Sequence, residues 1–132
     1  MKQNKFTDIE TIQLMTQYCQ RIENSARGVN FDVALFSQDD NAIDATAMNI
    51  IQLGERINSN LTEAFKQKYP EIPWRSYVGM RNKLTHVYFE LDTQILWESA
   101  INDVPALYKF CLERLEEEGL NAPNLILNDT TL

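Results

Sequence analysis

The sequence predicts an all-α protein, an up-and-down bundle of four to five helices forming one domain. Apolar residues recur at steps of three and four along most of the chain, which is the period of one helix face. The 132 residues include only 4 Gly and 4 Pro, too few for the many turns of an all-β domain. The chain also lacks the apolar and polar alternation of half-buried strands and any internal repeat.

A first helix is predicted over residues 8–27, with Thr7 or Asp8 as its cap and Gly28 as its stop. Its apolar stripe consists of Ile9, Ile12, Met15, Cys19, Ile22 and Ala26. The connector 28–37 is apolar enough that Phe31 and Phe36 are expected to pack onto the bundle.

A second helix is predicted over residues 39–59, capped by Ser37 or Asp39. Its seam steps by four and three, as in antiparallel helix packing, through Ile43, Ala47, Ile50, Gly54, Ile57 and Leu61. Gly54 within this seam indicates close approach of another helix. A short third helix is expected over residues 60–68.

Two prolines, Pro70 and Pro73, separate that short helix from a fourth, predicted from Pro73 to about His86. Asp92 or Thr93 then caps a fifth helix, in which Pro105 should introduce a kink or a break near residues 102–103. The seam of this helix consists of Trp97, Ile101, Val104, Tyr108, Cys111 and Leu115. Gly119 should end it, which divides the chain into a helical domain over residues 1–118 and a weakly ordered tail over residues 119–132.

The chain has no apolar run near the roughly 20 residues that cross a bilayer, and its first residues do not resemble a targeting signal. We therefore expect a cytoplasmic protein without a membrane partner. Cys19 and Cys111 lie far apart in sequence, unlike the cysteines of a metal knuckle or a secreted disulfide scaffold. Both are interpreted as reduced core thiols.

The net charge of −7 argues against binding to nucleic acid, but the charge is unevenly distributed. Residues 66–89 carry 5 basic and 1 acidic side chains, whereas residues 1–65 and 90–132 are both acidic. This basic segment is either a chance cluster on a solvated face or a local anion site on an acidic body.

Arg81 falls on the apolar stripe of the fourth predicted helix when the helix is drawn at 100° per residue. A permanent cation there requires an anion or a solvated cleft. Asn82 and His86 lie together at the edge of the stripe, close enough for a hydrogen bond between them, and Lys83 faces solvent. The alternative is structural: Arg81 pairs with an acid such as Glu55, and His86 caps the helix end.

Residues 69–89, YPEIPWRSYVGMRNKLTHVYF, resemble the signature of the HepT-like branch of the HEPN families. The resemblance extends over about residues 8–118, including the segment 49–55 and the pairs Trp97–Glu98 and Val104–Pro105. Val87 stands where that family often has Gly. The resemblance implies a homodimeric helical toxin of a type VII-like toxin–antitoxin pair, a metal-independent endoribonuclease acting on tRNA or mRNA.

The resemblance also assigns roles within this segment. Arg81 and His86 would be the catalytic pair, Asn82 a supporting residue, and Tyr88 the acceptor of AMP units added by a cognate minimal nucleotidyltransferase antitoxin (MntA-like). No metal site and no cofactor are expected. A higher oligomer with the antitoxin is a further possible assembly.

Chemistry and geometry agree with such a site. RNA provides its own nucleophile, the 2′-hydroxyl, so a histidine to move protons and an arginine to bind the phosphate suffice. Arg81 and His86 diverge by about 140° on one helix, so two protomers around a twofold axis would present them better than one.

For Tyr88 the alternative is a core tyrosine. The competing functions are a noncatalytic nucleotide- or substrate-binding subunit of a nucleotidyltransferase, and an adaptor dimer with a decayed motif.

Overall fold

The computed structural model describes residues 6–87 and 92–120, with the backbone alone for His86 and Val87, and these parts of the chain contain helices and no strand. Four long helices form the bundle: α1 (Asp8–Gly28), α3 (Asp40–Ser59), α5 (Trp74–Val87) and α7 (Val104–Glu117). Three short ones connect them: α2 (Val33–Ser37), α4 (Glu63–Lys68) and α6 (Thr93–Glu98). The prediction of an all-α fold is confirmed.

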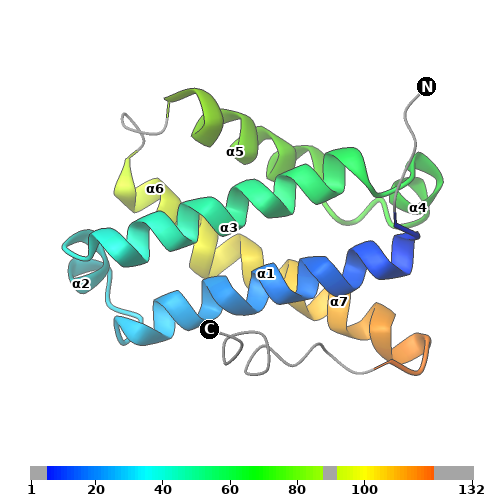
Figure 1. The fold of residues 1–132 in the computed structure, drawn as a ribbon, viewed down its shortest axis with the longest axis horizontal. Coiled ribbons are helices and arrows are strands. Elements are labelled where there is room, and N and C mark those ends of the chain that lie inside the picture. Colours follow the sequence, from blue (N-terminus) through cyan, green and yellow to red (C-terminus); the bar gives the residue numbers. More distant parts are fainter. Residues whose placement is uncertain (1–5, 88–91, 121–132) are drawn as a thin grey trace.

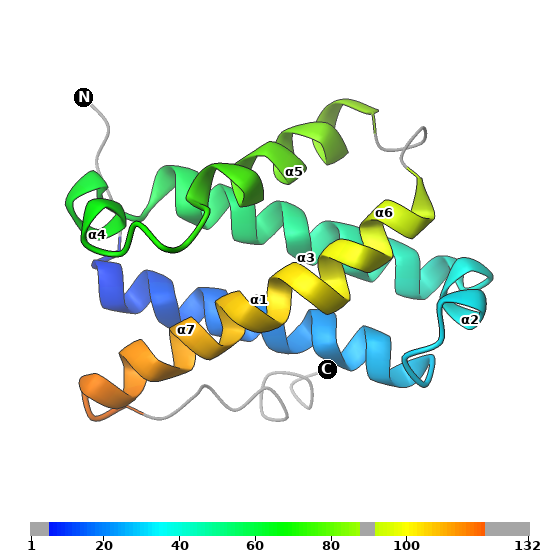
Figure 2. The ribbon, with the colours of Figure 1, turned by 180° about the vertical axis from the view of Figure 1, so that it is seen from behind.

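The long helices lie side by side in the order α5, α3, α1, α7, and consecutive long helices run in opposite directions (Figure 1). Seen from behind, α6 and α7 form one rod that crosses α3 and α1 diagonally (Figure 2). The core lies between this rod and the α3–α1 pair, and α5 packs at one edge, against α3. No helix within the described parts of the chain has both the length and the apolar character needed to cross a bilayer.

The first helix begins as its sequence predicts, with a capping box at Thr7. The Thr7 hydroxyl accepts a hydrogen bond from the Glu10 backbone N–H at 3.2 Å, and the Glu10 carboxylate accepts one from the Thr7 N–H at 2.9 Å. Cys19 on this helix and Cys111 on α7 are both free and buried. Burial raises the pKa of the Cys111 thiol to about 12, so both are uncharged core thiols as predicted.

The connector between α1 and α3 differs in part from the prediction. Phe36 is fully buried and its ring lies 4.9 Å from that of Trp97, as expected. Phe31, by contrast, is 52% exposed, so only part of its side chain packs onto the bundle. Asn30 and Phe31 both have positive φ, 56° and 53°, so the connector makes a left-handed turn here, and the Phe31 ring lies against the guanidinium of Arg27.

Pro105 produces the predicted interruption as a wide π-helical turn, η2 (Ser99–Asp103), between α6 and α7. The proline ring lacks an N–H and clashes with the carbonyl four residues earlier in a regular helix, and a wider turn relieves both problems. The extra residue shifts the register, which leaves Ile101 36% exposed although its spacing predicts a core position. Asp92 caps α6, and Gly119, with φ of +73°, follows α7 as expected.

Candidate active site

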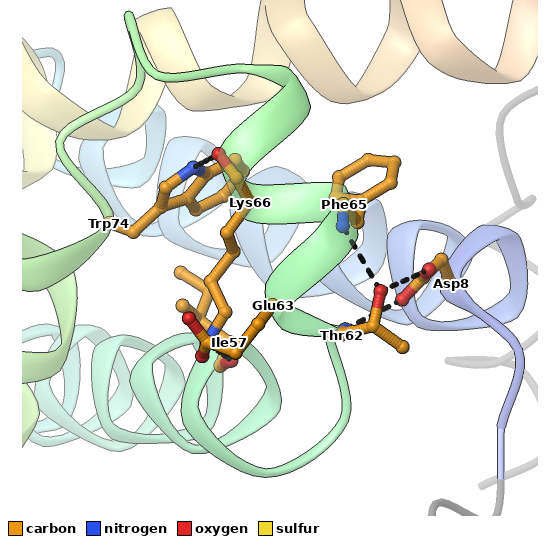
Figure 3. Close-up of polar contacts among 7 residues, drawn as sticks. All are labelled: Asp8, Ile57, Thr62, Glu63, Phe65, Lys66 and Trp74. Carbon is orange, nitrogen blue, oxygen red and sulfur yellow. Dashed lines mark hydrogen bonds and ion pairs between the residues drawn. The ribbon is translucent and has the colours of Figure 1, made fainter.

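The segment before α5 is tied down by aromatic packing. The indole N–H of Trp74 donates to the backbone oxygens of Lys66 and Tyr69, both at 3.1 Å; Figure 3 shows its bond to Lys66. The rings of Phe65, Tyr69 and Trp74 all contact Phe110 of α7, with centroids 5.0 to 6.3 Å away. The Tyr-Pro-Glu-Ile-Pro-Trp part of the signature is therefore structural: it fixes where α5 begins.

Arg81 lies where α3 and α5 come closest, directly over Gly54. A Cβ built on Gly54 would overlap the Cβ of Arg81 and lie 3.0 Å from both the Arg81 Cγ and the Tyr77 backbone oxygen. Only a residue without a side chain permits this approach. The predicted close approach at Gly54 is confirmed, and Arg81 is the residue that it accommodates.

The guanidinium of Arg81 is held by two neighbours. Its Nη2 forms an ion pair with the carboxylate of Glu55 on α3, and its Nη1 donates to the side-chain oxygen of Asn82. The Arg81–Glu55 pair is part-buried, with side-chain exposures of 27% and 31%. The structural alternative for Arg81, pairing with Glu55, is therefore confirmed, and the pair orients the arginine without removing it from solvent.

Glu55 is itself positioned by Ser59, one turn later on α3, whose hydroxyl donates to the second carboxylate oxygen at 2.6 Å. The Ser59 hydrogen bond lowers the pKa of Glu55 below its ordinary value, and Arg81 and Arg56 act in the same direction, whereas partial burial opposes them. Glu55 is thus a carboxylate anion at neutral pH. Glu55 was predicted only as a pairing partner of Arg81, and Ser59 was not predicted, although the two residues are four apart on one helix face.

Arg81 retains donors for a further ligand. A guanidinium has five N–H groups in a planar fork, and the two bonds described use two of them. The remaining donors belong to a side chain that is partly exposed. The arrangement can therefore bind an anion such as a phosphodiester while Glu55 and Asn82 hold the guanidinium plane in place.

The structure describes only part of the other predicted site residues. Asn82 is exposed, and its side-chain oxygen accepts from Arg81. His86 lies in the last turn of α5, one turn after Asn82, but its side chain is not described, so the expected Asn82–His86 hydrogen bond stays a prediction. Tyr88 lies outside the described residues. Among the side chains that are described, no three His, Cys, Asp or Glu residues gather in a way that could hold a metal ion.

Residues 15–114 match the family described as "Ribonuclease HepT-like". The chain belongs to this family. A protein of Caldanaerobacter subterraneus named "Putative RNase" is 30% identical over 107 residues, covering 81% of this chain and 93% of that protein. "Probable ribonuclease HepT" of Thermococcus cleftensis is 37% identical over 86 residues, covering 65% of this chain and 76% of its own length.

A third relative carries the same region beside another activity. "Gamma-glutamylcyclotransferase and putative RNase" of Methanocaldococcus jannaschii is 32% identical over 116 residues, which is 88% of this chain and 48% of that protein. No solved structure gives a significant match. These comparisons agree on a HepT-like family of proteins named as ribonucleases.

Proposed function

We propose that the protein is a metal-independent endoribonuclease toxin that cleaves tRNA or mRNA, with Arg81 and His86 as its catalytic pair and Asn82 as a supporting residue. The observation that carries this proposal is the part-exposed guanidinium of Arg81, which Glu55 and Asn82 hold in one orientation. Arg81 lies on α5, the helix that also contains His86. Membership of the HepT-like ribonuclease family supports the same reaction class.

The chemistry requires a proton acceptor, a proton donor and a phosphate ligand. A histidine acting as base removes the proton of the RNA 2′-hydroxyl, whose oxygen attacks the adjacent phosphorus and forms a 2′,3′-cyclic phosphate. The bond from phosphorus to the 5′-oxygen breaks, and a protonated histidine supplies the proton that this oxygen needs. Arg81 binds the nonbridging oxygens and stabilises their charge during the step.

A homodimer would complete this site. His86 lies five positions after Arg81 on α5, which places the two side chains about 140° apart on an ideal helix. A twofold axis beside α5 would bring two arginines and two histidines to one cleft, where one histidine serves as base and the other as acid. The paired basic segments would also concentrate positive charge on an otherwise acidic protein.

The biological setting that we propose is a type VII-like toxin–antitoxin pair. A cognate minimal nucleotidyltransferase antitoxin would add AMP to Tyr88 and place a phosphate and a base where RNA must enter, blocking it by charge and volume. The test is mass spectrometry after incubation with the neighbouring transferase and ATP. We expect an AMP-sized addition on Tyr88 and none on the Tyr88→Phe variant; an addition at another residue would refute the assignment.

The nuclease assay uses purified protein, tRNA or mRNA, and excess EDTA. We expect the wild type to cut and Arg81→Ala and His86→Ala each to lose about a hundredfold or more in rate. Lys83→Ala is the matched control, because Lys83 is an exposed cation on the same helix, and it should cut like the wild type. Equal cutting by all four proteins, or by none, would contradict the proposal.

A second function has one observation in its favour. Because Arg81 is already paired with Glu55, the site could be a binding surface in which the arginine serves structure. The protein would then be a noncatalytic subunit that presents nucleotide or substrate to a nucleotidyltransferase. Normal binding of nucleotide and transferase by both alanine variants, with RNA left intact by every protein, would favour this alternative.

A further inference from the structure

A polar groove of about 570 Å³ lies beside the candidate site, between the end of α3, the short helix α4 and the outer face of α5. Lys66 and Gln67 of α4 form one wall, and Arg75, Gly79 and Asn82 of α5 form the other. Asn82 is the residue that accepts a hydrogen bond from Arg81. The groove therefore includes a residue that contacts Arg81.

The groove residues of α5 follow one helical face. Arg75, Gly79 and Asn82 are spaced by four and three residues, and the next step of four along the same face reaches His86. The distance from Arg75 to His86 along the helix axis is about 16 Å at 1.5 Å per residue. The helix thus aligns an exposed cation, a glycine, an amide and the predicted catalytic histidine in one row.

The opposite wall is anchored to three long helices, as Figure 3 shows. The Thr62 backbone N–H and hydroxyl donate to the Asp8 carboxylate at 2.9 and 2.8 Å, which ties the start of α4 to α1. Lys66 donates to the Ile57 backbone oxygen on α3 at 3.2 Å, and Trp74 of α5 donates to the Lys66 backbone oxygen. These bonds hold α4 at a set distance from α5, so the groove is preformed.

Charge and shape both favour an extended polyanion. The charged residues that line the groove are Glu63, Lys66 and Arg75. Lys66 forms an ion pair with Glu63 at 3.0 Å, whereas Arg75 is exposed and forms no hydrogen bond or ion pair with any residue that the structure describes, which leaves one uncompensated positive charge. A Cβ on Gly79 would meet no atom within 4 Å, so the groove surface at this point is bare backbone beside open space. An uncompensated arginine next to exposed backbone can bind a phosphate and allow a strand to approach closely.

We propose that this groove binds the single-stranded RNA segment next to the scissile phosphate. Arg75 contacts a phosphate of that segment, Gly79 lets its backbone lie against α5, and Asn82 marks the point at which the strand reaches Arg81 and His86. The inference rests on the proposed ribonuclease function, because it assigns a path to that substrate. It adds Arg75 and Gly79 as substrate-binding positions.

The first test measures binding of a fluorescent 2′-O-methyl RNA of about 12 nucleotides, which lacks the attacking hydroxyl and is not cut. We expect Arg75→Gln to weaken binding about fivefold to tenfold and to reduce the slope of log affinity against log salt by about 0.7, the value for one phosphate contact on a single strand. Lys109→Gln on α7 removes the same charge away from the groove and should change neither quantity. Equal losses in the two variants would overturn the inference.

The second test narrows the groove without removing charge. Gly79→Gln places a side chain into the open space, and it should raise the thermal midpoint because glycine is a poor helix former. We expect it to weaken RNA binding at least threefold (about 0.7 kcal/mol or more) despite the added stability. Gly28→Gln at the end of α1, where a Cβ also meets no atom within 4 Å, is the control and should bind like the wild type. Unchanged binding by Gly79→Gln would overturn the inference.

Cleavage assays separate this inference from the proposed function. In the first outcome, the wild type cuts RNA and Arg75→Gln raises KM for a long RNA, while kcat and cleavage of a dinucleotide stay unchanged. The ribonuclease function and the groove inference are then both supported. If the wild type cuts RNA but Arg75→Gln has the wild-type KM, the groove is wrong and the ribonuclease function stands. If no protein cuts RNA but Arg75→Gln alone loses binding, the ribonuclease function fails and the groove remains a binding site.

Discussion

Two helix crossings in this bundle, α1 against α7 and α3 against α5, are built differently. The first is apolar at its centre, where Cys19, Leu107 and Cys111 have no exposed surface, although a pocket of about 270 Å³ lined in part by Glu23 and Lys109 lies beside them. The second has buried residues beneath it, but its edge carries the charged pair of Arg81 and Glu55 over a glycine. The first crossing buries apolar side chains at its centre, whereas the second also holds a cation at the surface in one orientation, as a phosphate-binding site requires.

The largest expected effect lies in the apolar crossing. Leu107→Ala removes a fully buried side chain of α7 and should lower the free energy of unfolding by about 2–5 kcal/mol, because it loses transfer free energy and leaves a cavity. Ile101→Ala, at a part-exposed position of the same rod, should lower it by less than about 1.5 kcal/mol. Urea unfolding followed by circular dichroism measures both. Similar losses of unfolding free energy in the two variants would contradict the full burial of Leu107.

An intermediate effect on stability is expected at Gly54, where α3 and α5 come closest. Gly54→Ala should lower the free energy of unfolding by about 1–3 kcal/mol, because the added methyl group overlaps the Arg81 side chain. A glycine within a helix normally gains about 0.5–1 kcal/mol from this change, so the sign is reversed. RNA cleavage should fall as well, because Arg81 is displaced. Gly28→Ala, with open space around it, is the control, and a stabilised Gly54→Ala variant would contradict the contact.

The smallest effect on stability concerns the ion pair between Arg81 and Glu55, and it depends on pH. The pKa of Glu55 is lowered in the folded protein, so its ionised form adds stability above the unfolded-state value of about 4.5 and loses that contribution as pH falls through the folded-state pKa. At pH 7 we expect Glu55→Gln to be less stable than the wild type by about 1 kcal/mol.

The difference between wild type and Glu55→Gln should shrink as pH falls from about 5 toward 3, because the wild-type carboxyl then becomes neutral as well. Urea unfolding at pH 7, 5 and 3 measures it. Glu113→Gln removes an exposed carboxylate of α7 and should match the wild type at pH 7. A difference for Glu55→Gln that grows at low pH would show that the ion pair does not stabilise the folded state.

Most helix boundaries follow from the sequence because their causes are local. Thr7, Asp39 and Asp92 each cap the helix that they were expected to cap, since a side-chain oxygen needs only the backbone N–H groups two or three residues ahead. Phe31 was expected to pack onto the bundle and Ile101 to lie in a helix seam, and 52% and 36% of their surfaces are exposed. At Ile101 a π-helical turn changed the direction of a side chain that a regular helical period places inside, and Phe31 belongs to a left-handed turn that no periodic pattern describes.

The candidate site was predictable in its residue types and only partly in its geometry. The position of Arg81 on the apolar stripe and the glycine in the α3 seam were both readable, and the two meet in the structure. The choice of Glu55 as partner was one of two open alternatives. The groove at Arg75 and Gly79 was not foreseen, because it depends on how far α4 stands from α5.

The sequence by itself determined the helical class, the caps, the buried stripe of each long helix and the segment that carries the family signature. Only the tertiary structure decided that Arg81 is paired yet part-exposed, that Phe31 is half-exposed and that an open groove includes Asn82 beside Arg81. The physical reason is the range of the interactions. Helical period and capping act between near neighbours in the chain, whereas ion pairs and grooves between helices depend on crossings that bring distant segments together.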